Sequence, residues 1–169
     1  MNSIESQFIT LDSSLDSRYN SENKTQQFTT PLARSLHIDC KIKVAITFIE
    51  YPVHWSYQDD SDLHDTRFFV SCSLTTNRTH LTGSGITHPG PFNTPVYTDS
   101  IYAFVPDPPK STSQSVALRR AYLEWWYIDP GPGRYVDTIG LTVKDVKGNL
   151  IRFHSDKPLR VGLRISTAL

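Results

Sequence analysis

The side chains best suited to chemistry lie in polar loops, and their spacing matches none of the usual sites. The loop Asp60-Ser61-Asp62-Leu63-His64 alternates acidic positions as calcium loops do, but it lacks their turn glycine and closing glutamate. Gly83-Ser84-Gly85 is neither followed by Lys-Ser/Thr, as a phosphate loop would be, nor set in a GxSxG nucleophile turn. The histidines stand at positions 37, 54, 64, 80, 88 and 154, without the short spacing of a zinc site. The sequence therefore predicts no catalytic residue, no metal and no cofactor.

Two adjacent tryptophans, Trp125 and Trp126, are candidates for a binding surface. Neighbouring residues of a strand point to opposite faces, so one indole can lie in the core while the other faces solvent or a partner. The chain holds three Trp, eight Tyr and eight Phe, and aromatic residues are enriched at interfaces. Two interpretations stay open: both indoles pack within the fold, or one of them meets a sugar or a neighbouring protein.

Composition favours one folded domain spanning residues 1–169. A chain of this length can bury its own core, and 38% of its residues are hydrophobic. The 17 basic residues balance 17 acidic ones, which argues against nucleic-acid binding as the main task. Apolar runs are shorter than the roughly 18 residues of a membrane-spanning helix, and the first residues lack the features of a signal peptide. We expect a soluble, non-secreted protein with Cys40 and Cys72 as buried free thiols.

The segment 41–57, KIKVAITFIEYPVHWSY, holds the clearest strand pattern. Apolar residues alternate over 41–51, as they do in a strand with one face in the core. The face predicted to be buried holds Ile42, Val44, Ile46 and Phe48. Pro52 has no N–H to donate and restrains its neighbour, so the strand should end there. Trp55 then belongs to a corner, where it plugs one end of the fold or faces a neighbour, and Pro52 and Trp55 are therefore structural or interface candidates.

The rest of the chain predicts short strands separated by turn residues. The expected strands are 7–11, 27–32, 41–51, 67–74, 100–105, 116–128, 138–144, 150–154 and 159–165. Pro31 should make the second of them an edge strand or end it. The turn 145–149 should let 150–154 pair back as a hairpin. A helix over 115–126 is the weaker alternative to a strand, in one piece or two, over 116–128.

About eight strands, with no alternating helices and with long polar loops, predict an all-β fold. The arrangement that suits them best is a two-sheet antiparallel β-sandwich of the single jelly-roll type.

Three segments also follow one another in a recognisable order. The first is Phe8–Ser14 (FITLDSS) with Tyr19–Asn23 and Phe28–Leu32. The second is Lys43–Pro52 (KVAITFIEYP) with Trp55. The third is Asp137–Asp145 (DTIGLTVKD) with Gly148, Phe153 and the last strand, and Ile101–Val105 lies between. In these motifs the chain resembles the penton-type, single jelly-roll minor capsid proteins of Polinton/Maverick-like elements and related adenovirus-like DNA viruses.

That resemblance implies a structural component of an icosahedral capsid, without catalytic residues. It implies a homopentamer at the vertices, beside a double jelly-roll major capsid protein, with a fibre or another minor capsid protein as a further candidate partner. The implied location is the virion, after assembly inside the host cell. Residues 1–6 are a candidate flexible arm that orders on assembly, and loops such as 79–95 and 106–115 are natural contact sites.

Two other functions fit an all-β sandwich. The runner-up is a jelly-roll carbohydrate- or receptor-binding module, with Trp125, Trp126 and nearby tyrosines on its surface. A glycan array would test that reading. An enzyme on a cupin-like barrel is the third possibility, and it should need a histidine-rich metal cluster that metal analysis would detect.

Overall fold

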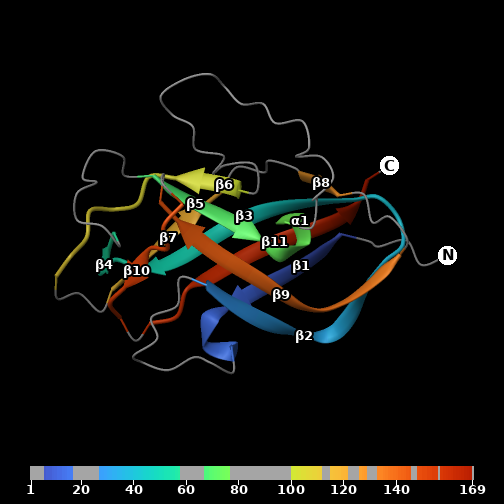
Figure 1. Cartoon of the computed structure of the whole chain (residues 1–169), viewed down its shortest axis with the longest axis horizontal. Helices are drawn as coiled ribbons and strands as arrows, with labels where there is room; N and C mark the ends of the chain where they lie inside the picture. The colour runs from blue at the N-terminus through green and yellow to red at the C-terminus, as the bar shows by residue number, and fades with distance from the viewer. Residues whose placement is uncertain are drawn as a thin grey trace, which may run out of the picture.

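The computed structural model of this chain shows two β-sheets packed face to face (Figure 1). It describes residues 6–16, 27–57, 67–76, 100–111, 115–121, 126–128, 133–145, 148–155 and 157–168. The first sheet contains β1 (Gln7–Asp12), β3 (Ile42–Pro52), β7 (Val116–Arg120), β8 (Trp126–Ile128) and β11 (Arg160–Thr167). The second contains β2 (Gln27–Ile38), β5 (Phe68–Cys72), β6 (Ser100–Phe104) and β9 (Arg134–Lys144). A small third pair joins β4 (Trp55–Ser56) to β10 (Arg152–Phe153), and the short turns are η1 (Ser13–Leu15) and α1 (Ser73–Thr76).

The connectivity is that of a single jelly roll. The first sheet has the order β1-β11-β3-β7, with β8 also paired to β3, and the second has the order β2-β9-β5-β6. Every strand pairing is antiparallel. Each sheet therefore places strands from the two ends of the chain side by side, and the chain crosses repeatedly between the sheets, as it does in jelly rolls. The prediction of an all-β jelly-roll sandwich is confirmed.

The strand β3 lies where the alternation predicted it, but its face pattern changes half-way along. Its register with β11 shifts between Gly162 and Leu163, which leaves Thr47 as the extra residue of a β-bulge. After the bulge Phe48 faces outward, opposite Gly162, and Ile49 is fully buried. The prediction that Phe48 belongs to the buried set is therefore wrong, because one inserted residue reverses the direction of every side chain after it.

The strand β2 continues through Pro31 instead of ending near it. β2 pairs only with β9 among the described strands, so it is an edge strand, as Pro31 predicted. At an edge the missing N–H of proline costs no ladder hydrogen bond. The register with β9 shifts between Pro31 and Leu36, so residues 32–35 form a wide irregularity, within which the Ser35 hydroxyl donates to the Asp137 carboxylate.

Two later segments also differ from their predictions. Within 116–128 the described residues form two strands, β7 and β8, which both pair with β3. The expected hairpin at 150–154 forms only as a bridge between Leu150 and Lys144, after a turn in which Gly148 has φ 85°. Beyond the bridge, β10 pairs with β4 and closes one end of the sandwich.

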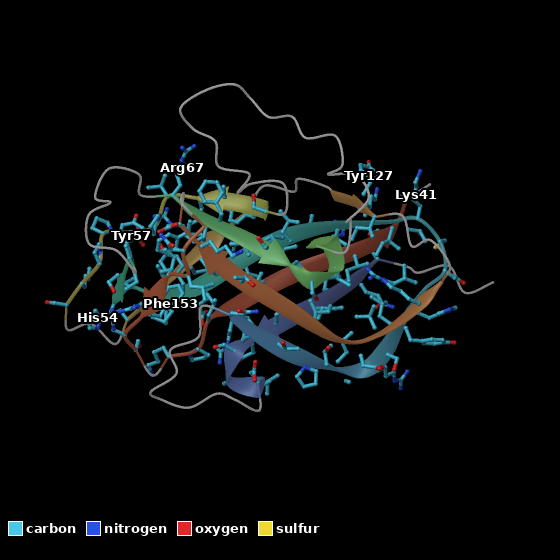
Figure 2. All side chains as sticks on the ribbon, viewed as in Figure 1. Lys41, His54, Tyr57, Arg67, Tyr127 and Phe153 are labelled. Carbon is cyan, nitrogen blue, oxygen red and sulfur yellow. The ribbon has the colours of Figure 1, made fainter. Side chains whose placement is uncertain are left out.

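The core is made of the inward side chains of both sheets, which the stick view shows between the ribbons (Figure 2). The fully buried residues include Phe28, Val44, Ile49, Phe68, Val70, Ile139, Val143, Val161, Leu163 and Ile165. Cys72 is buried and Cys40 only half-buried, so the prediction of two buried thiols is right for Cys72 alone, and both thiols are free. No helix among the described residues is long and apolar enough to cross a membrane.

Candidate interaction surface

The corner formed by Pro52 and Trp55 is buried at the end of the sandwich where Tyr57 and Phe153 lie in Figure 2. Trp55 is only 5% exposed. Its ring centroid lies 4.7 Å from that of Phe68 and 5.3 Å from that of Tyr57. Its indole N–H donates a hydrogen bond of 3.1 Å to a backbone carbonyl after β6. In this chain Trp55 therefore fills the end of the fold, and Pro52 is the last residue of β3.

Polar contacts fix the segment after β6 against this corner. The backbone N–H of Asp107 donates to the Tyr51 hydroxyl at 2.8 Å, and Arg119 donates to the Asp107 carboxylate. The hydrogen bond with Tyr51 and the charge of Asp107 raise the pKa of Arg119. The N–H of Lys110 donates to the carbonyl of Val53 at 3.0 Å. The described part of the predicted loop 106–115 is thus held by Tyr51 of β3, by Val53 after it and by Arg119 of β7.

A serine and two histidines meet where β4 joins β10. Ser56 Oγ and His154 Nε2 are 2.6 Å apart, and the ring centroids of His54 and His154 are 5.0 Å apart. The spacing resembles that of a serine activated by a base, but the same residues also join the strands, since the N–H of His154 donates to the carbonyl of His54. Within the described ranges, no three His, Cys, Asp or Glu residues gather as metal ligands. These contacts link β4 to β10 at the end of the sandwich.

Several predicted contact residues fall wholly or partly outside the described ranges. Trp125 and the loop 79–95 lie outside them, and Trp126 is described only through its backbone, which pairs with Val44. Residues 1–5 of the candidate arm also lie outside them, whereas the Ser6 hydroxyl accepts a hydrogen bond of 2.7 Å from Arg164 Nε.

The outer face of the first sheet carries large apolar side chains and arginines together. Its exposed apolar residues are Phe8, Val116, Leu118 and Tyr127. By register, Arg164 is the neighbour of Phe8, and Arg120 is the neighbour of Phe48. A solvated sheet face is normally polar, whereas aromatic residues and arginine are typical of the centres of protein interfaces. This face is the strongest candidate for an interaction surface, and we call it the outer β1–β7 face.

An ion-pair network crosses the outer β1–β7 face. Arg160 Nε lies 2.7 Å from Asp12 Oδ2, and Arg160 Nη1 lies 3.2 Å from Glu50 Oε1. Burial by itself raises the pKa of Asp12, but hydrogen bonds from Ser14 and Arg160 outweigh it and lower that pKa below its ordinary value. The same contacts raise the pKa of Arg160. Because Arg160 is partly exposed, each pair contributes about 0.2–1 kcal/mol.

Two aromatic rings of the same face each lie against a residue of β11. The Arg164 guanidinium carbon is 5.2 Å from the centroid of the Phe8 ring, within the range of a cation–π contact. The Phe48 ring occupies the space that a side chain at position 162 would fill, since a Cβ on Gly162 would lie 2.3 Å from it.

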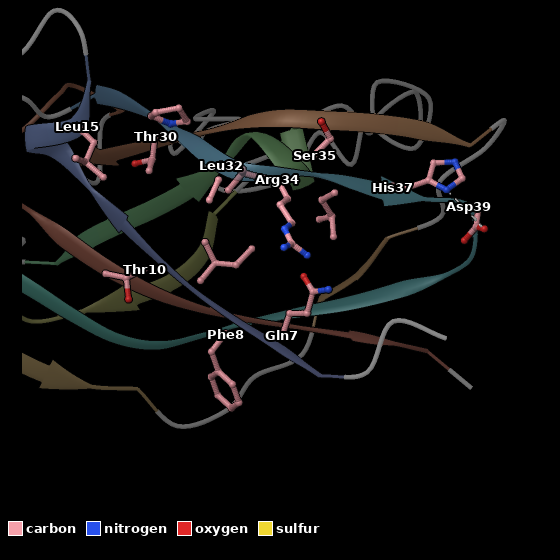
Figure 3. A pocket seen from close by; sticks show the side chains of 14 residues that line it. Gln7, Phe8, Thr10, Leu15, Thr30, Leu32, Arg34, Ser35, His37 and Asp39 are labelled. Atoms are coloured by element: carbon pink, nitrogen blue, oxygen red, sulfur yellow. Dashed lines mark ion pairs between the residues drawn. The ribbon is translucent and has the colours of Figure 1, made fainter. Parts of the chain in front are cut away.

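A groove opens beside this face, between the edge strands of the two sheets (Figure 3). It has a volume of about 870 Å³ and is lined by residues of β1 and by the irregular part of β2. Arg34 and Gln7 point toward each other across it. One end is closed by the Thr30 hydroxyl, which accepts from the Asp12 N–H and donates to the Asp12 carbonyl. We call this the edge groove.

No protein-family model matches this chain, and no curated protein matches it in sequence. The assignment of the outer β1–β7 face as an interaction surface therefore rests on the geometry of this chain.

Neither the outer β1–β7 face nor the edge groove was found from the sequence. The signal was present only in part: Arg160 and Arg164 alternate with buried residues in the last strand. Which residues of β1 and β7 lie beside them depends on strand order, and one chain's sequence does not reveal that order.

Proposed function

We propose that this protein is a structural capsid component, penton-like, that forms homopentamers and acts by assembly rather than catalysis. The observation that carries the proposal is the jelly-roll connectivity of the five-stranded and the four-stranded sheet. Jelly rolls also serve lectins and cupins, so the fold alone does not choose among them. The capsid role is favoured by the resemblance of the Phe8–Ser14, Lys43–Pro52 and Asp137–Asp145 segments to penton-type capsid proteins.

The kind of surface also supports a protein partner. The exposed apolar and arginine side chains lie on a sheet face, which offers a broad area rather than an enclosed site. Exposed aromatic and arginine side chains are typical of contacts between proteins. In the proposed function the neighbours are other copies of the chain, the double jelly-roll major capsid protein, and a fibre or another minor capsid protein. The protein then resides in the virion.

The test is the mass of the assembly in solution. Native mass spectrometry of the purified full chain should show a pentamer of the 19.2 kDa chain, and negative-stain images should show rings. The protein should also be present in purified virus particles. Monomers at every concentration, together with absence from particles, would refute the proposal. A specific glycan-array signal that is lost in Trp126→Ala would instead support a carbohydrate-binding module.

A further inference from the structure

The first sheet ends in two different open edges. Among the described residues, β1 pairs only with β11 and β7 pairs only with β3. An open edge presents backbone N–H and C=O groups that can pair with another strand. The positions of those groups can be derived for both strands from the hydrogen bonds at their ends.

On β1 the backbone N–H and C=O groups of the even-numbered residues point to the open side. The N–H of Ser13 donates to the carbonyl of Leu159, on the β11 side, whereas the N–H and C=O of Asp12 both meet the Thr30 hydroxyl on the opposite side. Backbone groups alternate in direction along a strand. Phe8 and Thr10 therefore direct their N–H and C=O away from β11, and within the described part of the chain these groups have no partner.

On β7 the backbone N–H and C=O groups of the even-numbered residues also point to the open side. The carbonyl of Ser115 accepts from Val53, and the N–H of Ala121 donates to Thr47, so odd-numbered residues face β3. The backbone groups facing away from β3 belong to Val116, Leu118 and Arg120.

The two edges are complementary in direction, face and register. Because all pairings are antiparallel and the sheet has the order β1-β11-β3-β7, β1 and β7 run in opposite directions. A second copy in the same orientation would therefore bring its β7 antiparallel to β1. The even-numbered side chains of both strands lie on the outer face, so pairing even with even residues keeps that face continuous.

We propose that β1 of one copy pairs with β7 of the next, with Phe8 opposite Arg120 and Thr10 opposite Leu118. Each of these residue pairs exchanges both backbone hydrogen bonds. The Phe8 ring, which already has Arg164 on one side, receives Arg120 on the other.

A second copy of this chain fits these edges better than an unrelated strand does. Each copy carries one edge of each kind, so the contact is head-to-tail and can close into a ring, as the proposed pentamer requires. The inference rests on the proposed function in that respect. The neighbouring edge, β2, is a poor alternative because Pro31 and the irregular residues 32–35 interrupt it.

Proline variants test the pairing, since each removes one N–H that faces the open edge. Thr10→Pro and Leu118→Pro should fold, because proline is tolerated at this kind of edge position. Each should shift the mass of the wild-type assembly to that of the 19.2 kDa monomer. Thr10→Val and Leu118→Val, which keep the N–H, are the matched controls and should assemble as the wild type does.

Mixing the two proline variants gives the sharpest result. Thr10→Pro keeps an intact β7 edge and Leu118→Pro keeps an intact β1 edge, so the mixture should form one-to-one heterodimers and nothing larger. Circular dichroism checks the fold of each variant. If one misfolds, hydrogen exchange of the wild type replaces it: the amides of Phe8, Thr10 and Leu118 should become protected on assembly.

The outcomes separate this inference from the proposed function. Assembly of both proline variants, or unprotected edge amides in the assembled wild type, would overturn the edge pairing and leave the capsid role intact. If Thr10→Pro fails to assemble while Leu118→Pro still assembles, β1 pairs symmetrically with β1 of another copy. That result would also overturn the proposed pairing of β1 with β7. A wild-type chain that stays monomeric at all concentrations would refute the proposed function and the edge pairing together.

Discussion

A methyl group at position 162 should destabilise the fold through the Phe48 ring. A Cβ there would lie 2.3 Å from Phe48 Cε1, 2.4 Å from Phe48 Cδ1 and 2.4 Å from Thr47 Oγ1. The ring and the hydroxyl must therefore move, and overpacking of this kind costs about 1–3 kcal/mol. Replacing glycine also restricts the unfolded chain, which stabilises the fold by roughly 0.4–1 kcal/mol. We expect Gly162→Ala to lower the free energy of unfolding by about 1–2 kcal/mol.

Urea unfolding followed by tryptophan fluorescence measures this loss, and the melting temperature should fall by about 2–8 °C. Gly140→Ala is the matched control, since a Cβ there would meet Ser73 Cβ at 3.5 Å, an ordinary contact. In a Phe48→Ala background the added cost of Gly162→Ala should shrink, which a double-mutant cycle would report as coupling. Wild-type stability of Gly162→Ala, or an equal loss in both backgrounds, would refute the reasoning.

Three further predictions concern the core, an ion pair and the thiols. Val44→Asp should abolish folding, because Val44 is fully buried and the change leaves an unpaired charge in the core; wild-type-like melting would contradict this. The pKa of Asp12 is lowered in the folded protein, so its carboxylate stabilises the fold at neutral pH and loses that effect as the pH falls through the lowered value. Asp12→Asn should therefore be less stable than wild type at pH 7 and equally stable in acid, as urea unfolding at a series of pH values would show. Burial raises the pKa of Cys72 to about 12, so at neutral pH a thiol reagent should label only Cys40 in the native protein and both thiols in denaturant.

The strands could be predicted because their side-chain pattern is local. The alternation in 41–51 places β3 within one residue of its observed bounds, and the last strand is found the same way from Leu159 to Ile165. Period-two patterning reports which residues leave water on a sheet, and that requires no knowledge of the partner strand. The jelly-roll class followed from the number of such strands and the absence of helical periodicity.

The bulge at Thr47 could not be predicted, because it depends on a distant part of the chain. The register shift occurs opposite Gly162, more than a hundred residues away in sequence. Gly162 has no side chain, which lets the Phe48 ring lie across β11 and makes the outward position of Phe48 possible. Within 41–51 nothing distinguishes Phe48 from the buried residues before it, so local pattern assigned it to the wrong face.

At the corner Tyr51–Trp55, one feature was determined by the sequence and another by the tertiary structure. The sequence by itself determined that β3 stops at Pro52, because proline lacks the N–H that a ladder needs. Only the tertiary structure decided that Trp55 faces Phe68 and donates to the Asp107 carbonyl rather than to a neighbour. Likewise, the sequence determined which segments become strands, whereas strand order decided that β1 and β7 end the same sheet with opposite directions. The side-chain pattern of a strand is a local property of the chain. Which strand ends a sheet depends on how all the other strands pair.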